Sequence, residues 1–201
     1  MLKFSDVSKR YKSKFAVKSI NINIENGKVY LFVGENGSGK STTIKLISRI
    51  IYTNEFSIFK NEYKRIMYLP DKRNYPKTLS SLDFLKYYLV NQDLKKIEEY
   101  MIKYELPNKA ISSLSKGNMQ KVGIIQMVLS DGDLYAFDEP TDGLDNESIS
   151  LFIEDLKELV SKGKTIVIST HKKNLYSDLK PNIYKFEDGV CNEKKRKTKI
   201  N

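Results

Sequence analysis

Short apolar runs alternate with helix-like patterns along most of the chain. Residues 28–34 (KVYLFVG), 134–140 (LYAFDEP) and 165–170 (TIVIST) are apolar in the continuous way that is typical of buried parallel strands. Residues 41–51 (STTIKLISRII) and 149–160 instead place apolar side chains every three or four positions, which predicts helices. Strands that alternate with helices predict an α/β fold with a mainly parallel sheet.

A block of helical sequence interrupts this alternation. Residues 81–104 predict two helices, the second of which is ended by Pro107, and a further helix is expected after Ser115. This block, about residues 72–130, is expected to form a helical lobe of its own. Shorter candidates for strands lie on its N-terminal side, at residues 19–23, 56–60 and 65–70.

The composition fits one compact domain. The chain has 201 residues, of which 40% are hydrophobic and 30% charged, so it can build one core with a small lobe. Since no internal repeat or Pro/Gly linker divides it, residues 1–192 are predicted to be a single domain and residues 193–201 a disordered basic tail. No run reaches the roughly 18 apolar residues of a membrane span and no secretory signal is present, which predicts a soluble protein that is not exported. The single cysteine, Cys191, suits a reducing compartment.

The net charge is strongly positive but selects no function. The formal charge is +10, from 35 Lys+Arg and 25 Asp+Glu. The tail holds five basic residues and one acid, so it supplies +4 and leaves +6 on the rest. A basic surface favours nucleic acid, nucleotides or an anionic membrane. It is more typical, however, of a protein from a lysine-rich proteome with a solvated tail.

Residues 34–41 (GENGSGKS) match the pattern G-x-x-x-x-G-K-[ST] between a predicted strand and a predicted helix. In such a loop the glycines Gly34, Gly37 and Gly39 allow positive φ angles and let backbone N–H groups surround phosphate oxygens. The following helix adds the positive end of its dipole. Lys40 is expected to reach the β- and γ-phosphates, and the Ser41 hydroxyl to ligate Mg²⁺. The predicted nucleotide-binding residues here are Gly34, Glu35, Asn36, Gly37, Ser38, Gly39, Lys40, Ser41 and Thr42.

An acidic pair follows the apolar run at residues 134–140. Asp138 ends this predicted strand, where it can hold the Mg²⁺ shell, and Glu139 is placed to polarise an attacking water. A DE pair at a strand end is common in isolation, but after a phosphate loop it indicates nucleotide hydrolysis. We therefore predict Lys40 and Glu139 as catalytic residues.

The polar stretch LSKGN (114–118) precedes an apolar helix far from the phosphate loop. Ser115 can cap this helix, and Gly117 leaves its first turn uncovered, so free N–H groups can bind an anion. Taken alone, the stretch is more typical of an ordinary helix cap. Its position 23 residues before Asp138 favours a second phosphate contact.

The order of these motifs resembles that of the ATP-binding cassette (ABC) ATPases, over about residues 2–190. GENGSGKST is similar to their Walker A motif, LSKGN to their signature and LYAFDEP to their Walker B motif. DGLD (142–145) resembles the D-loop, and STH (169–171) contains a residue similar to the switch histidine. The resemblance implies a P-loop NTPase core with a small antiparallel β subdomain and an inserted helical lobe. It also implies bound ATP and Mg²⁺ and hydrolysis of the ATP.

Further residue roles follow from this resemblance. Two such domains meet head to tail, so Ser115, Gly117 and Asn118 are expected to contact the γ-phosphate held by a partner's phosphate loop. His171, the only histidine in the chain, is expected to sense the γ-phosphate as a third catalytic residue. Tyr11 lies where the family places an aromatic ring that stacks on adenine.

One position departs from the family pattern. After residues 65–70 the family usually carries a glutamine that reaches the Mg²⁺ and the attacking water, whereas this chain has Asp71. An aspartate is shorter and charged, so it would bind Mg²⁺ strongly yet repel the γ-phosphate unless the metal or Lys72 screens it. We predict that Asp71 keeps the glutamine's role of coupling the nucleotide state to a membrane partner, with an altered metal geometry. The predicted metal-ligand set is therefore Ser41, Asp71 and Asp138.

These expectations favour the ATPase subunit of a membrane transporter. It would pair with a second cassette, identical or paralogous, and with separate integral membrane permease subunits that dock on residues 70–112 near Asp71. It would then lie in the cytoplasm at the inner face of the cell membrane. The chain is a short version of the cassette, and in this and in its LSKG signature it is similar to bacterial export and resistance subunits. This similarity favours export over import.

The alternative is a soluble ABC ATPase that acts on nucleic acid or on an assembly complex. The interval between the phosphate loop and the signature is too short for the long coiled-coil insertion of the DNA-repair relatives, and the chain holds one cassette where translation-type relatives hold two. No nucleic acid partner is therefore expected. Salt-sensitive binding of DNA or RNA would instead favour the alternative.

Overall fold

A six-stranded sheet forms the centre of the molecule. The computed structural model describes residues 1–53 and 55–194. The first five strands in the sheet order are parallel, and the last runs antiparallel to its neighbour. In order across the sheet they are β5 (Ile66–Leu69), β6 (Leu134–Asp138), β7 (Thr165–Thr170), β3 (Val29–Val33), β8 (Asn182–Glu187) and β9 (Val190–Lys194). The predicted α/β fold with a mainly parallel sheet is confirmed.

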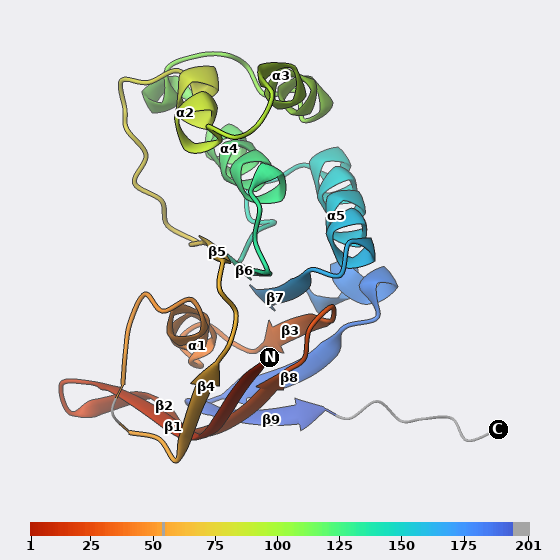
Figure 1. The fold of residues 1–201 in the computed structure, drawn as a ribbon. Helices are drawn as coiled ribbons and strands as arrows, with labels where there is room; N and C mark the ends of the chain where they lie inside the picture. The colour runs from red at the N-terminus through yellow and green to blue at the C-terminus, as the bar shows by residue number, and fades with distance from the viewer. Residues whose placement is uncertain (54, 195–201) are drawn as a thin grey trace.

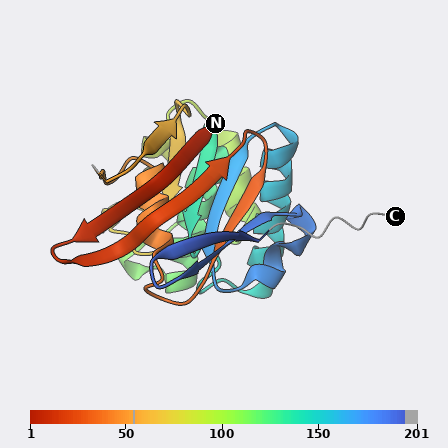
Figure 2. The same ribbon diagram turned by 90° about the horizontal axis from the view of Figure 1, so that it is seen from below.

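A smaller antiparallel sheet packs beside the first. Its order is β2 (Lys14–Ile24), β1 (Leu2–Tyr11) and β4 (Ile58–Asn61). The hairpin end of β1 and β2 projects away from the rest of the molecule (Figure 1 and Figure 2). The alternation in β1 is broken by register shifts, and Asp6 has a φ of 53°. Because of these irregularities, β1 carries no clean strand signal in the sequence.

The helical lobe lies at one end of the molecule, above the sheet in Figure 1. Its helices are α2 (Ser81–Tyr88), α3 (Leu94–Lys103) and α4 (Lys116–Leu129), with a short 3₁₀ helix η1 (Ile111–Ser113). The side chains of Ser80, Asp93 and Ser115 cap the three α-helices by accepting backbone N–H bonds. On the core side lie α5 (Asn146–Ser161) and the 3₁₀ helix η2 (Lys173–Leu179).

The first helix, α1 (Lys40–Ile47), is shorter than its apolar pattern predicts. Arg49 takes a φ of 57°, its N–H bonds to the carbonyl oxygen of Leu46, and the N–H of Ile50 bonds to that of Lys45. This is the Schellman arrangement that ends a helix. The prediction that the helix continues to residue 51 is wrong, because this turn leaves Ile50 exposed outside the helix.

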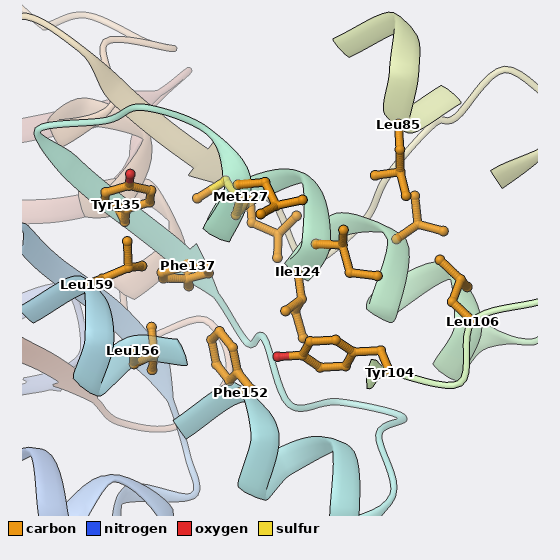
Figure 3. Close-up of a cluster of buried hydrophobic side chains, with 14 of the residues drawn as sticks. Leu85, Tyr104, Leu106, Ile124, Met127, Tyr135, Phe137, Phe152, Leu156 and Leu159 are labelled. Carbon is orange, nitrogen blue, oxygen red and sulfur yellow. The ribbon is translucent and has the colours of Figure 1, made fainter. Parts of the chain in front are cut away.

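Two apolar clusters cover the two faces of the parallel sheet. Alternate side chains of each strand point to opposite faces, so Phe137 joins the cluster under α4 and α5, while Ala136 joins the one under α1. Figure 3 shows Phe137 packed against Phe152 of α5 and, farther out, the lobe residues Tyr104 and Leu106. Helical lobe and core thus share one continuous cluster. Burying each such large side chain stabilises the fold by about 1.5–3 kcal/mol.

One predicted boundary, the start of the C-terminal tail at residue 193, differs in the structure. Strand β9 runs to Lys194, so the first two residues of the predicted tail belong to the sheet. The rest of that tail, residues 195–201, lies outside the described residues. Within the described residues, no helix has both the length and the apolar character needed to cross a bilayer.

Candidate active site

The predicted chemical groups gather at the carboxyl edge of the parallel sheet. Strand β3 leads into the glycine loop at residues 34–39, β6 ends at Asp138, and β7 ends directly before His171. These three strands are neighbours in the order β6-β7-β3, so their ends meet at one edge. Segments that are about 30 to 130 residues apart in the chain therefore form one site.

The glycine loop uses its glycines for two different reasons. Gly37 and Gly39 have φ angles of 81° and 106°, which side chains rarely adopt. Gly34 does not have a positive φ, so that part of the prediction is wrong. A Cβ at Gly34 would lie 2.2 Å from the carbonyl oxygen of Phe186 in β8. Gly34 is required because two backbones approach closely at this point.

Lys40 lies across the loop that should hold a phosphate. Its side chain is buried, and Nζ donates hydrogen bonds to the carbonyl oxygens of Gly34 (2.7 Å) and Glu35 (2.9 Å). No side chain caps α1, so the N–H groups of its first turn remain free to bind an anion. A hollow of about 170 Å³ opens over these groups. Its lining residues are Ala16, Asn36, Gly37, Gly39, Lys40, Ser41, Thr42, Asp71 and Glu139.

A hydroxyl and a carboxylate lie side by side at this hollow. Ser41 Oγ donates a hydrogen bond of 3.0 Å to Oδ1 of Asp138, which is 3% exposed. The hydroxyl of Ser169, from β7, donates to the same oxygen. Hydroxyl and carboxylate oxygens are ligand types that Mg²⁺ prefers, so Ser41 and Asp138 fit the predicted metal. Ser169 was not predicted, although a serine inside the apolar run 165–170 was a signal for it.

Glu139 is held in a strained and largely dehydrated position. Its φ is 46°, and its N–H bonds to the carbonyl oxygen of Ser169 at 3.1 Å. Its Oε2 lies 3.1 Å from Nδ1 of His171, while Oε1 is buried without a hydrogen-bond partner among the described residues. Burial raises the pKa of Glu139, and His171 and Lys40 oppose this rise. The structure thus brings two predicted catalytic residues together, with one carboxylate oxygen free to accept a proton.

Two nearby acids complete the charged surroundings. Asp71, whose metal role is a prediction, lines the same hollow as Lys40 and Ser41. Asp142 was not predicted, yet it has a carboxylate oxygen within 4.8 Å of ligand atoms of Glu139 and His171. Lys172 Nζ donates to Asp142 at 3.0 Å and offsets its charge. Asp142 begins the DGLD stretch that resembles the D-loop, but only the fold shows that the turn after β6 brings it next to the end of β7.

Tyr11 is not part of the wall of the site. Its ring is 49% exposed at the end of β1, with the Lys9 ammonium 5.6 Å from the ring centroid. Its strand partner Lys14 lines a second hollow of about 690 Å³, together with His171 and residues 34–38 of the phosphate loop. Within the described residues, Tyr11 lines neither hollow. Its contact with adenine stays a prediction.

The LSKGN stretch lies on the lobe, away from both hollows. Ser115 is exposed and its Oγ accepts the N–H of Asn118 at 3.1 Å, so it caps α4 as predicted. A Cβ at Gly117 would lie 2.6 Å from the carbonyl oxygen of Gly143, which gives this glycine a further role in packing. Within the described residues, Ser115, Gly117 and Asn118 line neither hollow. One chain therefore does not bring them to its own phosphate loop.

Comparison with known proteins gives a consistent set of similarities. The family model described as ABC transporter matches residues 17–142. An uncharacterized ABC transporter ATP-binding protein, MJ1023 of Methanocaldococcus jannaschii, is 31% identical over 180 residues, which cover 85% of this chain and 68% of the relative. The lantibiotic transport ATP-binding protein SrtF of Streptococcus pyogenes is 30% identical and covers 85% and 80%, respectively. The glutamine transport ATP-binding protein GlnQ of Bacillus subtilis is 29% identical and covers 94% and 88%.

Solved structures show the same similarity in three dimensions. The dimeric post-hydrolysis structure of the ATP-binding cassette MJ0796, bound to ADP and Pi, is 26% identical. It superposes with a TM-score of 0.84 over 97% of this chain and 98% of that one.

Proposed function

Because the chain belongs to the ABC transporter family of ATP-binding cassettes, we propose that it drives a transporter by closing head to tail with a second cassette around two ATP–Mg²⁺. As a member of this family it is an ATPase. One observation carries the proposal. Lys40 and Glu139 line one hollow, whereas the signature residue Ser115 lies outside it on the lobe. A second chain must supply the signature if both are to contact one ATP.

The residues in the hollow have distinct roles in this proposal. Lys40 and the free N–H groups of α1 bind the phosphates. Ser41 and Asp138 hold Mg²⁺, which would neutralise phosphate charge when bound. Glu139, oriented by His171, positions the attacking water and accepts its proton. Burial and the contact with His171 keep the Glu139 carboxylate in place for this step.

The partners follow from the same arrangement. The chain's relatives are named for transport, and no described helix of this chain can span a bilayer, so separate permease subunits would form the membrane path. We propose that they dock on residues 70–112 near Asp71, which places the protein at the inner face of the membrane. Relatives named for glutamine, carnitine and lantibiotic transport match at 29%, 28% and 30% identity. These names select no cargo or direction, and export stays a prediction.

Dilution is expected to lower the ATPase activity per molecule. Below the dissociation constant of the dimer, the dimeric fraction falls in proportion to concentration, so a tenfold dilution should lower the specific activity about tenfold. Measuring ATP turnover per chain over a wide concentration series checks this. ATP binding by single chains is the control, since the phosphate loop is complete in one copy. A specific activity that stays constant on dilution would contradict the proposed function.

Replacing Asp71 is expected to change the Mg²⁺ dependence of turnover. Asp71→Ala removes a carboxylate from the wall of the hollow, so the half-saturating Mg²⁺ concentration should rise about tenfold. Asp71→Gln introduces the side chain that the family usually carries and should restore most of the rate. Asp71→Asn removes the charge of the side chain but keeps its shape, so it shows which of the two the Mg²⁺ dependence requires. Unchanged Mg²⁺ dependence and rate in the alanine variant would show that Asp71 is not a metal ligand.

A further inference from the structure

A fully buried carboxylate lies between the helical lobe and the core. Asp155, midway along α5, is 2% exposed beside the apolar cluster that the lobe and the core share. It accepts hydrogen bonds from Tyr104 Oη and Lys103 Nζ, both at 2.5 Å, and from Tyr100 Oη at 3.4 Å. We call these four side chains the Asp155 cluster. A buried carboxylate is costly unless it is paired, so these donors hold it firmly.

The Asp155 cluster joins two parts of the fold. The acceptor is on the core helix α5, and the three donors come from α3 and its C-cap residue in the helical lobe. Figure 3 shows the Tyr104 hydroxyl directed from the lobe toward Phe152 of α5. Burial and the nearby carboxylate raise the pKa of both tyrosines, so their hydroxyls remain donors. Hydrogen bonds are directional, unlike the apolar packing around them, so they oppose sliding of α3 along α5.

A second ion pair joins the N-terminal end of α5 to the lobe. Asp145, the N-cap of α5, lies 3.3 Å from Nζ of Lys121 in α4, and the Lys121 side chain is only 9% exposed. Asp145 and Asp155 are ten positions apart, which corresponds to about 15 Å along a helix. With a single contact the lobe could rotate about that point. Two contacts along α5 instead fix the angle between the lobe and the core. Figure 1 shows α5 beside α4, with α3 at the upper end of the lobe.

The angle of the lobe determines where the signature lies. Ser115 and Gly117 are at the N-terminus of α4, in the same lobe as the donors of the Asp155 cluster. We propose that Asp155 is a positioning residue for ATP turnover: it holds the lobe at the angle that lets the signature meet the nucleotide of a second copy. This inference rests on the proposed function. When the orientation of the lobe is already fixed in the single chain, less conformational entropy is lost as two chains associate. The Asp155 cluster therefore favours dimerisation.

The test uses the full chain carrying Glu139→Gln, which is expected to keep ATP bound. Asp155→Asn, Lys103→Met and Tyr104→Phe are added singly. Each variant should weaken ATP-dependent dimerisation about tenfold, measured as a dissociation constant by analytical ultracentrifugation. The affinity of the single chain for ATP should stay within about twofold, because none of the four cluster side chains, all within the described residues, lines either hollow at the phosphate loop. If the cluster only stabilised the fold, its loss would not weaken dimerisation while leaving the affinity for ATP unchanged.

A matched control is available on the same helix. Glu158 bonds to Lys162, one turn farther along α5, and both side chains are more than half exposed. Glu158→Gln removes a carboxylate whose hydrogen bond and ion pair go to Lys162 and not to the Asp155 cluster, so dimerisation should be unchanged. Tyr100→Phe removes the longest bond of the cluster and should have the smallest effect. Lys103→Met and Tyr104→Phe carry the test where Asp155→Asn does not fold, as judged by its thermal transition.

The outcomes separate this inference from the proposed function. If the Glu139→Gln parent dimerises with ATP but the folded cluster variants dimerise equally well or more tightly, the positioning role is overturned and the proposed function stands. A parent that stays monomeric with ATP and Mg²⁺ overturns the proposed function, and this inference with it. Weaker dimerisation in the cluster variants, with an unchanged Glu158→Gln control, supports the positioning role.

Discussion

Glu139→Gln is expected to lower ATP turnover about a thousandfold while ATP binding persists, because an amide cannot accept the proton of the attacking water. The side chain keeps its size, so the strained backbone at this position and the contact with His171 should survive. Removing a buried negative charge near the phosphates also stabilises bound ATP. The variant should therefore accumulate as an ATP-bound dimer.

Two measurements check this expectation. Turnover is followed by phosphate release, and dimer formation by light scattering with ATP and Mg²⁺ present. Glu147→Gln is the matched control, because Glu147 is an exposed carboxylate in the first turn of α5, on the same segment of chain. It should leave both quantities unchanged. Substantial turnover by Glu139→Gln would show that another group accepts the proton.

Ser115→Asp is expected to lower ATP turnover at least about a hundredfold without unfolding the chain. Aspartate caps helices as well as serine does and is favoured at their N-termini, so the bond to the Asn118 N–H has a replacement. The thermal midpoint should stay within about 2 °C of that of the unmodified chain. In the proposed dimer, however, the new carboxylate would face the γ-phosphate bound by the other chain and repel it. Ser115→Asn, which caps without charge, is the control.

Mixing two inactive variants tests whether this effect acts between chains. Lys40→Ala damages the phosphate loop, and Ser115→Asp damages the signature. A mixed dimer has one site built from the intact Lys40 of one chain and the intact Ser115 of the other. Random pairing should therefore restore about a quarter of the unmodified activity. No recovery in a mixture that demonstrably forms mixed dimers would contradict the head-to-tail arrangement.

The parts of the site that could be predicted from the sequence are those whose residues lie close together in the chain. The phosphate loop occupies residues 34–41, so its residue types and spacing are visible together in the chain. The cap at Ser115 involves a bond over only three residues. Ser169, by contrast, stands out only as a polar residue in an apolar run, and its partner Asp138 is defined only when β7 lies next to β6.

Irregular backbone explains the errors in the fold. The apolar pattern after the phosphate loop continues to residue 51, but the positive φ of Arg49 ends α1 at Ile47. Strand β1 was not predicted, because its register shifts remove the period of two on which strand recognition depends. Neither feature involves a glycine or a proline, which are the usual signals of such changes.

The sequence by itself determined the alternation of strands and helices, the α/β class and the chemical identity of the phosphate loop, because each depends on residues that are close in the chain. The tertiary structure alone decided which distant groups meet. It placed Phe186 against Gly34 and Gly143 against Gly117, and it brought Asp142 near His171. It also placed the donors of α3 around Asp155. Such contacts depend on how sheet and helices pack, and packing brings together residues whose separation in sequence carries no periodic signal.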